Sequence, residues 1–260
     1  MRRFINDIKR YWPYISYSAV CDLRSEVASS YLNWLWWILD PICFMLVYVF
    51  VGTVVFRNRE PYFPIFVFLG LTLWYFFSKN TSASTTLVRS YKSIVSKVYI
   101  PRYMLVLQKM ITNFVKMCIS ITLIILMLLI YRVPFSIKII YIFPIMMVVI
   151  IVTFGISTIL LHLGVFMDDL SNIINVLLRL VMYLSGIFYS LDTRVPEPYN
   201  KLLLYGNPLA FCIDATRKSI LYQNTPNIKV LIIWFIFGLS LSGVGVSLVY
   251  RYESIYAKVI

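Results

Sequence analysis

Long apolar segments recur along the chain and constrain its fold more than any other feature. Six of them are long enough to cross a hydrocarbon core of about 30 Å at about 1.5 Å per helical residue. We expect these spans at 32–56, 62–85, 103–131, 141–166, 170–191 and 228–250. With 60% hydrophobic and 13% charged residues, a soluble domain would carry more apolar surface than its core could hide. The predicted fold class is an all-α polytopic membrane protein with six transmembrane helices.

Residues 1–31 precede the first span and are predicted to stay in the cytoplasm. They include basic residues but no apolar run long enough for a secretory signal. From Tyr14 to Tyr31 charged residues alternate with apolar ones, which is typical of an amphipathic helix in the membrane interface. A soluble cytoplasmic helix is the alternative. Residues 32–260 would then form the transmembrane domain.

Charge between the spans predicts the orientation and the partners. The formal net charge is +13, and the basic residues are scattered in short inter-span segments. This distribution suits a lipid bilayer with anionic headgroups, or a phosphate-bearing substrate, better than nucleic acid. An excess of Lys and Arg in the short loops on one side favours a multi-pass protein of the cytoplasmic membrane with both termini in the cytoplasm.

The segment from Leu87 to Arg102 lies between the second and third spans and is basic without one acidic residue. At helical spacing its apolar and basic side chains separate onto two faces, so a short helix could lie flat at the membrane surface until Pro101 ends it. An ordinary basic loop that obeys the positive-inside rule fits the residues equally well. The residues of interest are Leu87, Arg89, Tyr91, Lys92, Ile94, Lys97, Pro101 and Arg102, of which Lys97 and Arg102 are candidate contacts for phosphate oxygens.

No motif of a soluble enzyme is present in the sequence. The chain lacks a Gly-x-x-x-x-Gly-Lys-Ser/Thr loop, so any ATP must be bound elsewhere. His162 is the single histidine and is interpreted as a packed, hydrogen-bonded side chain rather than a zinc ligand. Asp168 and Asp169 are interpreted as a cap of the fifth helix rather than a glycosyltransferase motif. We predict no catalytic site, no metal site, no cofactor in this chain and no disulfide among Cys21, Cys43, Cys118 and Cys212.

The segment from Asp192 to Asn227 is the longest between two spans. It contains four prolines, yet Leu202–Leu204 and Leu209–Phe211 are apolar clusters. Such clusters predict two short helices that dip into the outer face of the membrane and are broken at Gly206–Pro208.

Four sequence stretches occur in an order that resembles a known family. They are Arg24–Pro41, Phe63–Phe77, Ser96–Arg102 and Asn207–Pro208. Together they resemble the type-2 ABC transporter permeases of the polysaccharide, O-antigen and teichoic-acid export family, over nearly the whole chain. The chain departs from the family's pattern in three places, which bear on the substrate subtype more than on the fold: Leu32-Asn33 for the usual Leu-Gly, Asp168-Asp169 for Arg-Asp, and Ser185-Gly186-Ile187 for Ser-Pro-Ile.

The resemblance implies a homodimer seated on a pair of nucleotide-binding ATPase subunits that hold ATP and magnesium. The substrate would be a glycan carried on a polyprenyl diphosphate. Residues 87–102 would be the cytoplasmic coupling and gate helix, and the short helices between the fifth and sixth spans would be outer gate helices, with Tyr199, Tyr205, Asn207 and Pro208 as gate residues. A permease for a drug or lipid, or a membrane-embedded glycosyl or lipid transferase, are the alternatives.

Aromatic residues make up 17% of the chain, and flat aromatic faces suit sliding contact with sugar rings. An interfacial belt is the competing interpretation of any one ring. The candidate substrate path comprises Trp36, Trp37, Asp40, Tyr75, Phe76 and Arg179.

Asp40 and Arg179 are ionisable residues at similar depth in the first and fifth spans. An unpaired charge there costs several kcal/mol. They are predicted to form a buried ion pair, which could link two copies of the chain. The alternative is that Arg179 faces an aqueous path and attracts a phosphate while Asp40 is hydrated near the interface.

Overall fold

The computed structural model describes residues 2–28, 30–55, 57, 60–95 and 99–259, and the regular structure in these ranges is helical. Seven helices have 15 or more residues: α1 (Arg2–Val27), α2 (Trp36–Phe50), α3 (Phe63–Ser84), α6 (Tyr103–Ile130), α7 (Ile142–Phe166), α8 (Leu170–Leu184) and α12 (Ile228–Val259). The shorter elements are η1 (Asn33–Leu35), η2 (Val51–Val55), α4 (Leu87–Ser90), α5 (Lys92–Val95), η3 (Ile137–Tyr141), α9 (Leu191–Arg194), α10 (Tyr199–Gly206) and α11 (Pro208–Ile220).

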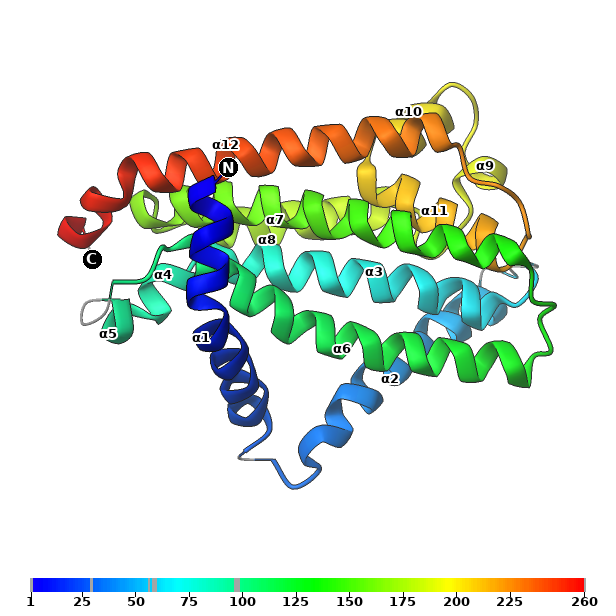
Figure 1. Ribbon diagram of the computed structural model, residues 1–260. Helices are drawn as coiled ribbons and strands as arrows, with labels where there is room; N and C mark the ends of the chain where they lie inside the picture. Colours follow the sequence, from blue (N-terminus) through cyan, green and yellow to red (C-terminus); the bar gives the residue numbers. More distant parts are fainter. Residues whose placement is uncertain (1, 29, 56, 58–59, 96–98, 260) are drawn as a thin grey trace.

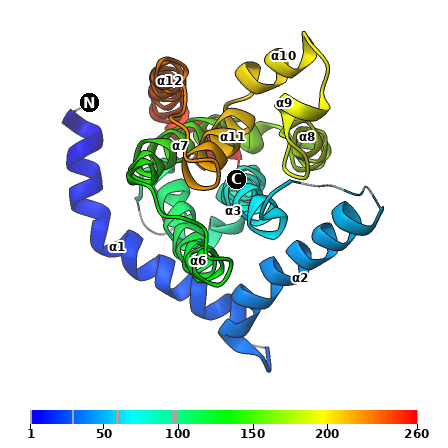
Figure 2. The same cartoon turned by 90° about the vertical axis from the view of Figure 1, so that its right-hand side faces the viewer.

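Helix α3 forms the centre of the bundle. Its first half is apolar on every side, and residues 65–74 are all buried. A helix that is hydrophobic all round must be surrounded by other elements. Helices α2, α6, α7, α8 and α11 pack against it, and Figure 2 shows α3 among them when the bundle is seen end on.

Four helical segments are long and apolar enough to cross a membrane: Asn33–Val55, Tyr103–Ile130, Ile137–Phe166 and Ile228–Glu253. They confirm a polytopic, helical membrane protein. Helices α3 and α8 occupy the other two predicted spans but do not meet the same criteria. The polar residues that end α3, from Ser78 to Ser84, lower its hydropathy, and α8 has only 15 residues. Six spans therefore stay a prediction.

Both described ends of the chain lie at the same end of the bundle, together with α4 and α5 (Figure 1). Helices α9, α10 and α11 lie at the opposite end. Helix α1 crosses the bundle instead of running along it. It buries Ile15, Ala19 and Val27 and exposes Trp12 and Tyr17, so it is amphipathic as predicted. It begins at Arg2 rather than near Tyr14 and contains Pro13.

The segment between α8 and α12 contains the predicted pair of short helices, α10 and α11. They are separated at Asn207, whose side-chain oxygen accepts a hydrogen bond from the Leu209 amide at 3.0 Å. Pro208 occupies the first turn of α11, where its missing N–H costs nothing. A polar cap followed by proline therefore explains why the helix restarts at this point.

Helices α7 and α12 pack together over much of their length, and small residues let their backbones approach. A Cβ added at Gly155 would lie 2.7 Å from Leu241 Cβ, and one added at Gly238 would lie 2.9 Å from Val152 Cγ2. A Cβ added at Gly245 would collide with the buried Thr158 side chain. Gly243 is two residues away on α12 and has open space around it.

We expect Gly245→Ala to destabilise the protein by about 1–3 kcal/mol, because the added methyl group overpacks the α7–α12 interface. Gly243→Ala is the matched control on the same helix and should leave stability unchanged or slightly raised, since alanine favours a helix. Thermal unfolding of the two purified variants in one detergent measures the difference. Equal unfolding temperatures would contradict the close packing.

Candidate functional site

A cavity of about 580 Å³ lies where the C-terminal end of α1 and the start of α2 face α3 and α6. Its α3 wall is made of residues three or four positions apart, which lie on one helical face. The cavity combines three kinds of side chain: aromatic (Trp36, Trp37, Tyr75, Phe76), cationic (Lys79, Lys109, Lys116) and carboxylate (Glu26, Asp40).

The aromatic wall contains most of the predicted substrate path. Trp36, Trp37, Asp40, Tyr75 and Phe76 all line the cavity. The indole N–H of Trp36 donates to Ser30 Oγ at 2.8 Å, which fixes the orientation of that ring. The sixth predicted residue, Arg179, does not line this cavity and is exposed on α8.

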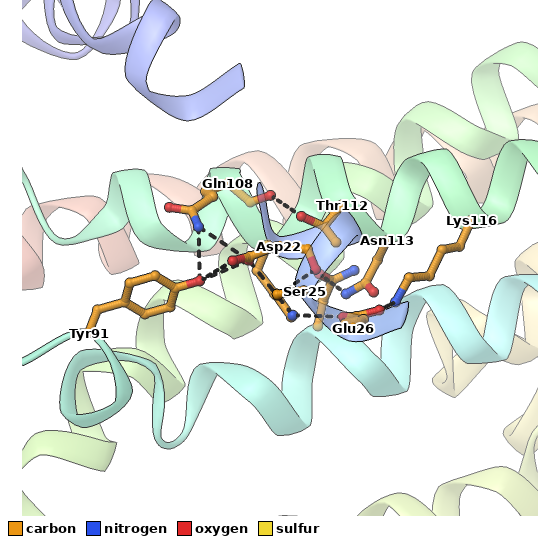
Figure 3. Close-up of polar contacts among 10 residues, drawn as sticks. Asp22, Ser25, Glu26, Tyr91, Gln108, Thr112, Asn113 and Lys116 are labelled. Carbon is orange, nitrogen blue, oxygen red and sulfur yellow. Dashed lines mark hydrogen bonds and ion pairs between the residues drawn. The ribbon is translucent and has the colours of Figure 1, made fainter. Parts of the chain in front are cut away.

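Two of the three lysines that line the cavity, Lys109 and Lys116, lie on α6 and pair with α1; Figure 3 shows the contact of Lys116 with Glu26. Lys109 Nζ lies 3.3 Å from Glu26 Oε1, and Lys116 forms an ion pair with Glu26 Oε2. Lys109 also lies 3.9 Å from Asp22 Oδ2. Since Asp22 and Glu26 are four residues apart, both carboxylates lie on the face of α1 that meets α6.

Glu26 is held in its ionised form by this arrangement. Burial on its own raises the pKa of the Glu26 carboxyl, but the hydrogen bond and charge of Lys116, with the charge of Lys109, outweigh burial. The pKa therefore lies below its ordinary value of 4.5. The stabilisation that Glu26 contributes is present above that pH and is lost as pH falls through the lowered folded-state pKa.

Tyr91 joins the predicted coupling segment to the same network. Its hydroxyl lies 2.8 Å from both Asp22 carboxylate oxygens and donates to them. Gln108 Nε2 donates to Tyr91 Oη at 2.9 Å and to Asp22 Oδ2 at 3.2 Å. Burial first, and then the hydrogen bond to Asp22, raises the pKa of Tyr91, so the hydroxyl stays protonated. The contacts tie the end of α4 to α1 and α6.

Arg89 ties the same segment to the α7–α8 turn. It forms an ion pair with Asp168, and its Nη2 donates to the Val165 carbonyl at 3.4 Å. The predicted cap of the fifth helix is confirmed for the position of Asp169 but not for Asp168. Asp169 occupies the N-cap position of α8 without a side-chain cap hydrogen bond, and Asp168 is engaged by Arg89 instead.

The rest of the coupling segment differs from a single surface helix. It forms two short helices, α4 and α5, with a break at Tyr91. Leu87 and Pro101 are buried and Lys92 is exposed. Lys97 and the side chain of Ile94 lie outside the described residues.

Arg102 is buried rather than presented at a surface. Its guanidinium lies 3.8 Å from the Glu253 carboxylate and donates to the Ile100 carbonyl at 2.9 Å. The Arg102 guanidinium, which was a candidate phosphate contact, is therefore already bound by groups of its own chain.

Arg217 anchors helix α11 and was not singled out from the sequence. Its buried guanidinium donates to the carbonyls of Phe66 at 3.1 Å, Gly186 at 2.7 Å and Ile187 at 2.6 Å. Gly70 leaves room for it, since a Cβ there would lie 2.8 Å from Arg217 Nη2. Helix α11 is thereby fixed to α3 and to the turn after α8.

The predicted outer gate residues lie around the same helices. Tyr199 and Tyr205 are exposed, and the ring of Tyr205 lies 6.5 Å from that of Phe211. Asn207 Nδ2 donates to Ser185 Oγ at 2.9 Å. Pro208, beside it, is half-buried.

Asp40 and Arg179 do not pair with each other within the described part of one chain, and both are exposed. His162 is hydrogen-bonded to Tyr256 Oη at 2.6 Å, which confirms a packed histidine. The four cysteines are free thiols, with Cys212 buried.

The sequence reasoning missed Asp22, Glu26 and Gln108 as members of the site. The available signal was the pair of carboxylates four residues apart at the end of the amphipathic helix. An equally polar first half of α6 carries Lys109 and Lys116. Charged residues near a membrane seek opposite partners, so the two sets could have been matched.

Most of the chain is similar to known membrane transport proteins. Residues 23–221 match the family model described as ABC-2 type transporter. The chain is 27% identical over 240 residues to the O-antigen export system permease protein RfbA of Klebsiella pneumoniae, covering 92% of each chain. It is 26% identical over 257 residues to the protein of that name from Myxococcus xanthus, covering 98% of this chain and 96% of the other. It is 20% identical over 206 residues to the polysialic acid transport protein KpsM of Escherichia coli, covering 77% and 78%.

We expect Tyr91→Phe to loosen the α4–α1 contact, because Asp22 loses its hydroxyl donor. The loss of such a hydrogen bond costs about 1–3 kcal/mol, so amide hydrogens of residues 87–95 should exchange roughly tenfold faster or more. Tyr17→Phe is the matched control, since Tyr17 is exposed on α1. Hydrogen–deuterium exchange with mass spectrometry measures both variants, and identical exchange would show that the network does not hold α4.

Proposed function

Because the chain belongs to the ABC-2 type transporter family, we propose that it is the permease subunit of an ABC exporter that moves a polysaccharide out across the cytoplasmic membrane. The names of relatives aligned over most of the chain support a polysaccharide cargo. The chain is a transporter subunit and not an enzyme. ATP and magnesium are held by a separate nucleotide-binding subunit.

The cavity between α1, α2, α3 and α6 is the observation that carries the substrate class. A glycan linked to a polyprenyl diphosphate has sugar rings, charged phosphate oxygens and an apolar tail. Aromatic faces such as those of Trp37 and Tyr75 suit the sugars, and ammonium groups suit phosphate oxygens. The cavity offers both kinds of side chain on helices that belong to the membrane region.

The end of the bundle that carries α4 and α5 is the proposed cytoplasmic face, where the ATPase partner contacts residues 87–102. Both described ends of the chain lie there (Figure 1), in agreement with the excess of basic residues predicted for the cytoplasmic side. Arg89 links this segment to the α7–α8 turn and Tyr91 links it to α1, so movement of the segment could reach the bundle by two contacts. Helices α3 and α8 complete six spans in this account.

The functional unit is proposed to be a homodimer, with Asp40 of one copy paired to Arg179 of the other. Both side chains are exposed on one chain, and an exposed charge at membrane depth favours a partner. The alternative is that Arg179 faces an aqueous path. Swapping the charges, Asp40→Arg with Arg179→Asp, should restore part of the export that each single change impairs. If the double variant exports no better than the worse single variant, the Asp40–Arg179 pair is wrong.

Depletion of the protein should trap a lipid-linked glycan on the inner leaflet, because the carrier lipid cannot move its polar head across unaided. Leaflet-specific labelling of the glycan measures this. The wild-type gene should restore outer display, Trp37→Ala with Tyr75→Ala should not, and Phe143→Ala is the control at an exposed ring outside the cavity. Undiminished outer display after depletion would contradict the proposed function and favour a drug or lipid permease or a transferase.

A further inference from the structure

The charged lining of the cavity is partly neutralised from within the chain. Lys109 and Lys116 are both directed to Glu26, and each contacts a different carboxylate oxygen. Their side chains are about one quarter exposed, 24% and 28%. Lys79 lies in the same lining and forms no ion pair within the described ranges. Glu26 is therefore the carboxylate that Lys109 and Lys116 share, and Lys109 also lies 3.9 Å from Asp22 Oδ2.

The geometry of this pair suits a larger anion. Lys109 and Lys116 are seven residues apart on α6, which separates their backbones by about 10.5 Å along the helix axis. The Glu26 carboxylate lies between the two ammonium groups, with one oxygen on each lysine. Two linked phosphoryl groups placed there could each contact one lysine. A diphosphate carries more charge than one carboxylate and accepts stronger charge-assisted hydrogen bonds. It is therefore able to displace Glu26 towards solvent, to which the Glu26 side chain is already 33% exposed.

We propose that Lys109 and Lys116 form a diphosphate subsite for the lipid-linked glycan, and that Glu26 occupies this subsite when no substrate is bound. The inference rests on the proposed function and assigns the phosphate contacts within it. Lys79 supplies a further positive charge to the loaded site.

Loading the subsite changes the contacts of α1. Lys109 lies between Glu26 and Asp22, and Asp22 accepts the hydrogen bonds of Tyr91 and Gln108. A diphosphate that draws Lys109 away from these carboxylates alters the network that holds α4. The same step therefore signals the presence of substrate to the segment that faces the ATPase.

The test is equilibrium binding of a radiolabelled polyprenyl diphosphate to the permease with its nucleotide-binding partner, in nanodiscs of phosphatidylcholine. Glu26→Gln should bind several-fold tighter than the wild type, because the competing charge is gone. Lys109→Gln and Lys116→Gln should each bind about tenfold weaker, or more, through loss of a charge-assisted hydrogen bond. Lys116→Arg should keep most of the affinity.

Matched controls lie at the other end of the bundle. Glu197→Gln removes an exposed carboxylate that pairs with Lys201 at 2.8 Å, and Lys229→Gln removes an exposed lysine. Neither should change the dissociation constant. Thermal unfolding of each variant identifies a loss of binding that follows from misfolding, and Glu26→Gln must gain affinity, which misfolding cannot imitate.

An unchanged or weaker affinity of Glu26→Gln would overturn the inference, as would equal competition by phosphatidylglycerol, which would assign the lysines to bulk anionic lipid. If Glu26→Gln, Lys109→Gln and Lys116→Gln all bind like the wild type, the diphosphate subsite is wrong, while the proposed function is not contradicted. The proposed function fails separately, if depletion does not trap the glycan on the inner leaflet.

Discussion

Every charge carried into an apolar bundle must find a partner or water, because an isolated ion in hydrocarbon costs several kcal/mol. This constraint explains the main tertiary links of the chain. Arg217 is satisfied by three backbone carbonyls and so fixes α11 to α3 and the turn after α8. Glu26 is satisfied by Lys109 and Lys116 and so fixes α1 to α6. The first link rigidifies the end of the bundle that carries α9, α10 and α11, and the second lies beside the cavity.

The two links differ in how easily they can change. Arg217 is 3% exposed and donates to backbone carbonyls, which are fixed by the helices that carry them. Its hydrogen bonds are therefore expected to stay in place. Glu26 is partly exposed, and its partners are flexible lysine side chains that another anion can engage. A transporter of the proposed kind needs both properties, since α9, α10 and α11 must keep their alignment while the proposed substrate site exchanges partners. Tyr91 and Asp22 extend the exchangeable link to α4, so one polar network joins the proposed substrate site to the segment proposed to face the ATPase.

The sequence predicted those parts of the fold that depend on local pattern. The apolar segments, the break at Asn207 and the aromatic cluster from Trp36 to Phe76 follow from composition and spacing. The pairing of groups far apart in the chain could not be read in this way. Arg217 is anchored by the Phe66 carbonyl, 151 positions away, and every residue has a carbonyl, so no residue type marks such a partner. Arg102 was likewise predicted at the surface. Its partner Glu253 lies on the last helix, and no local pattern around Arg102 indicates that pairing.

Photo-crosslinking of a diazirine-bearing polyprenyl diphosphate to the assembled transporter tests the central claim most directly. The claim is that the cavity between α1, α2, α3 and α6 receives the charged head of a lipid-linked glycan. Peptide mapping should then find the label on residues that line this cavity, on α3 and the first half of α6, and excess unlabelled polyprenyl diphosphate should abolish it. Specific labelling confined to α8 around Arg179, with the cavity unlabelled, would contradict the account.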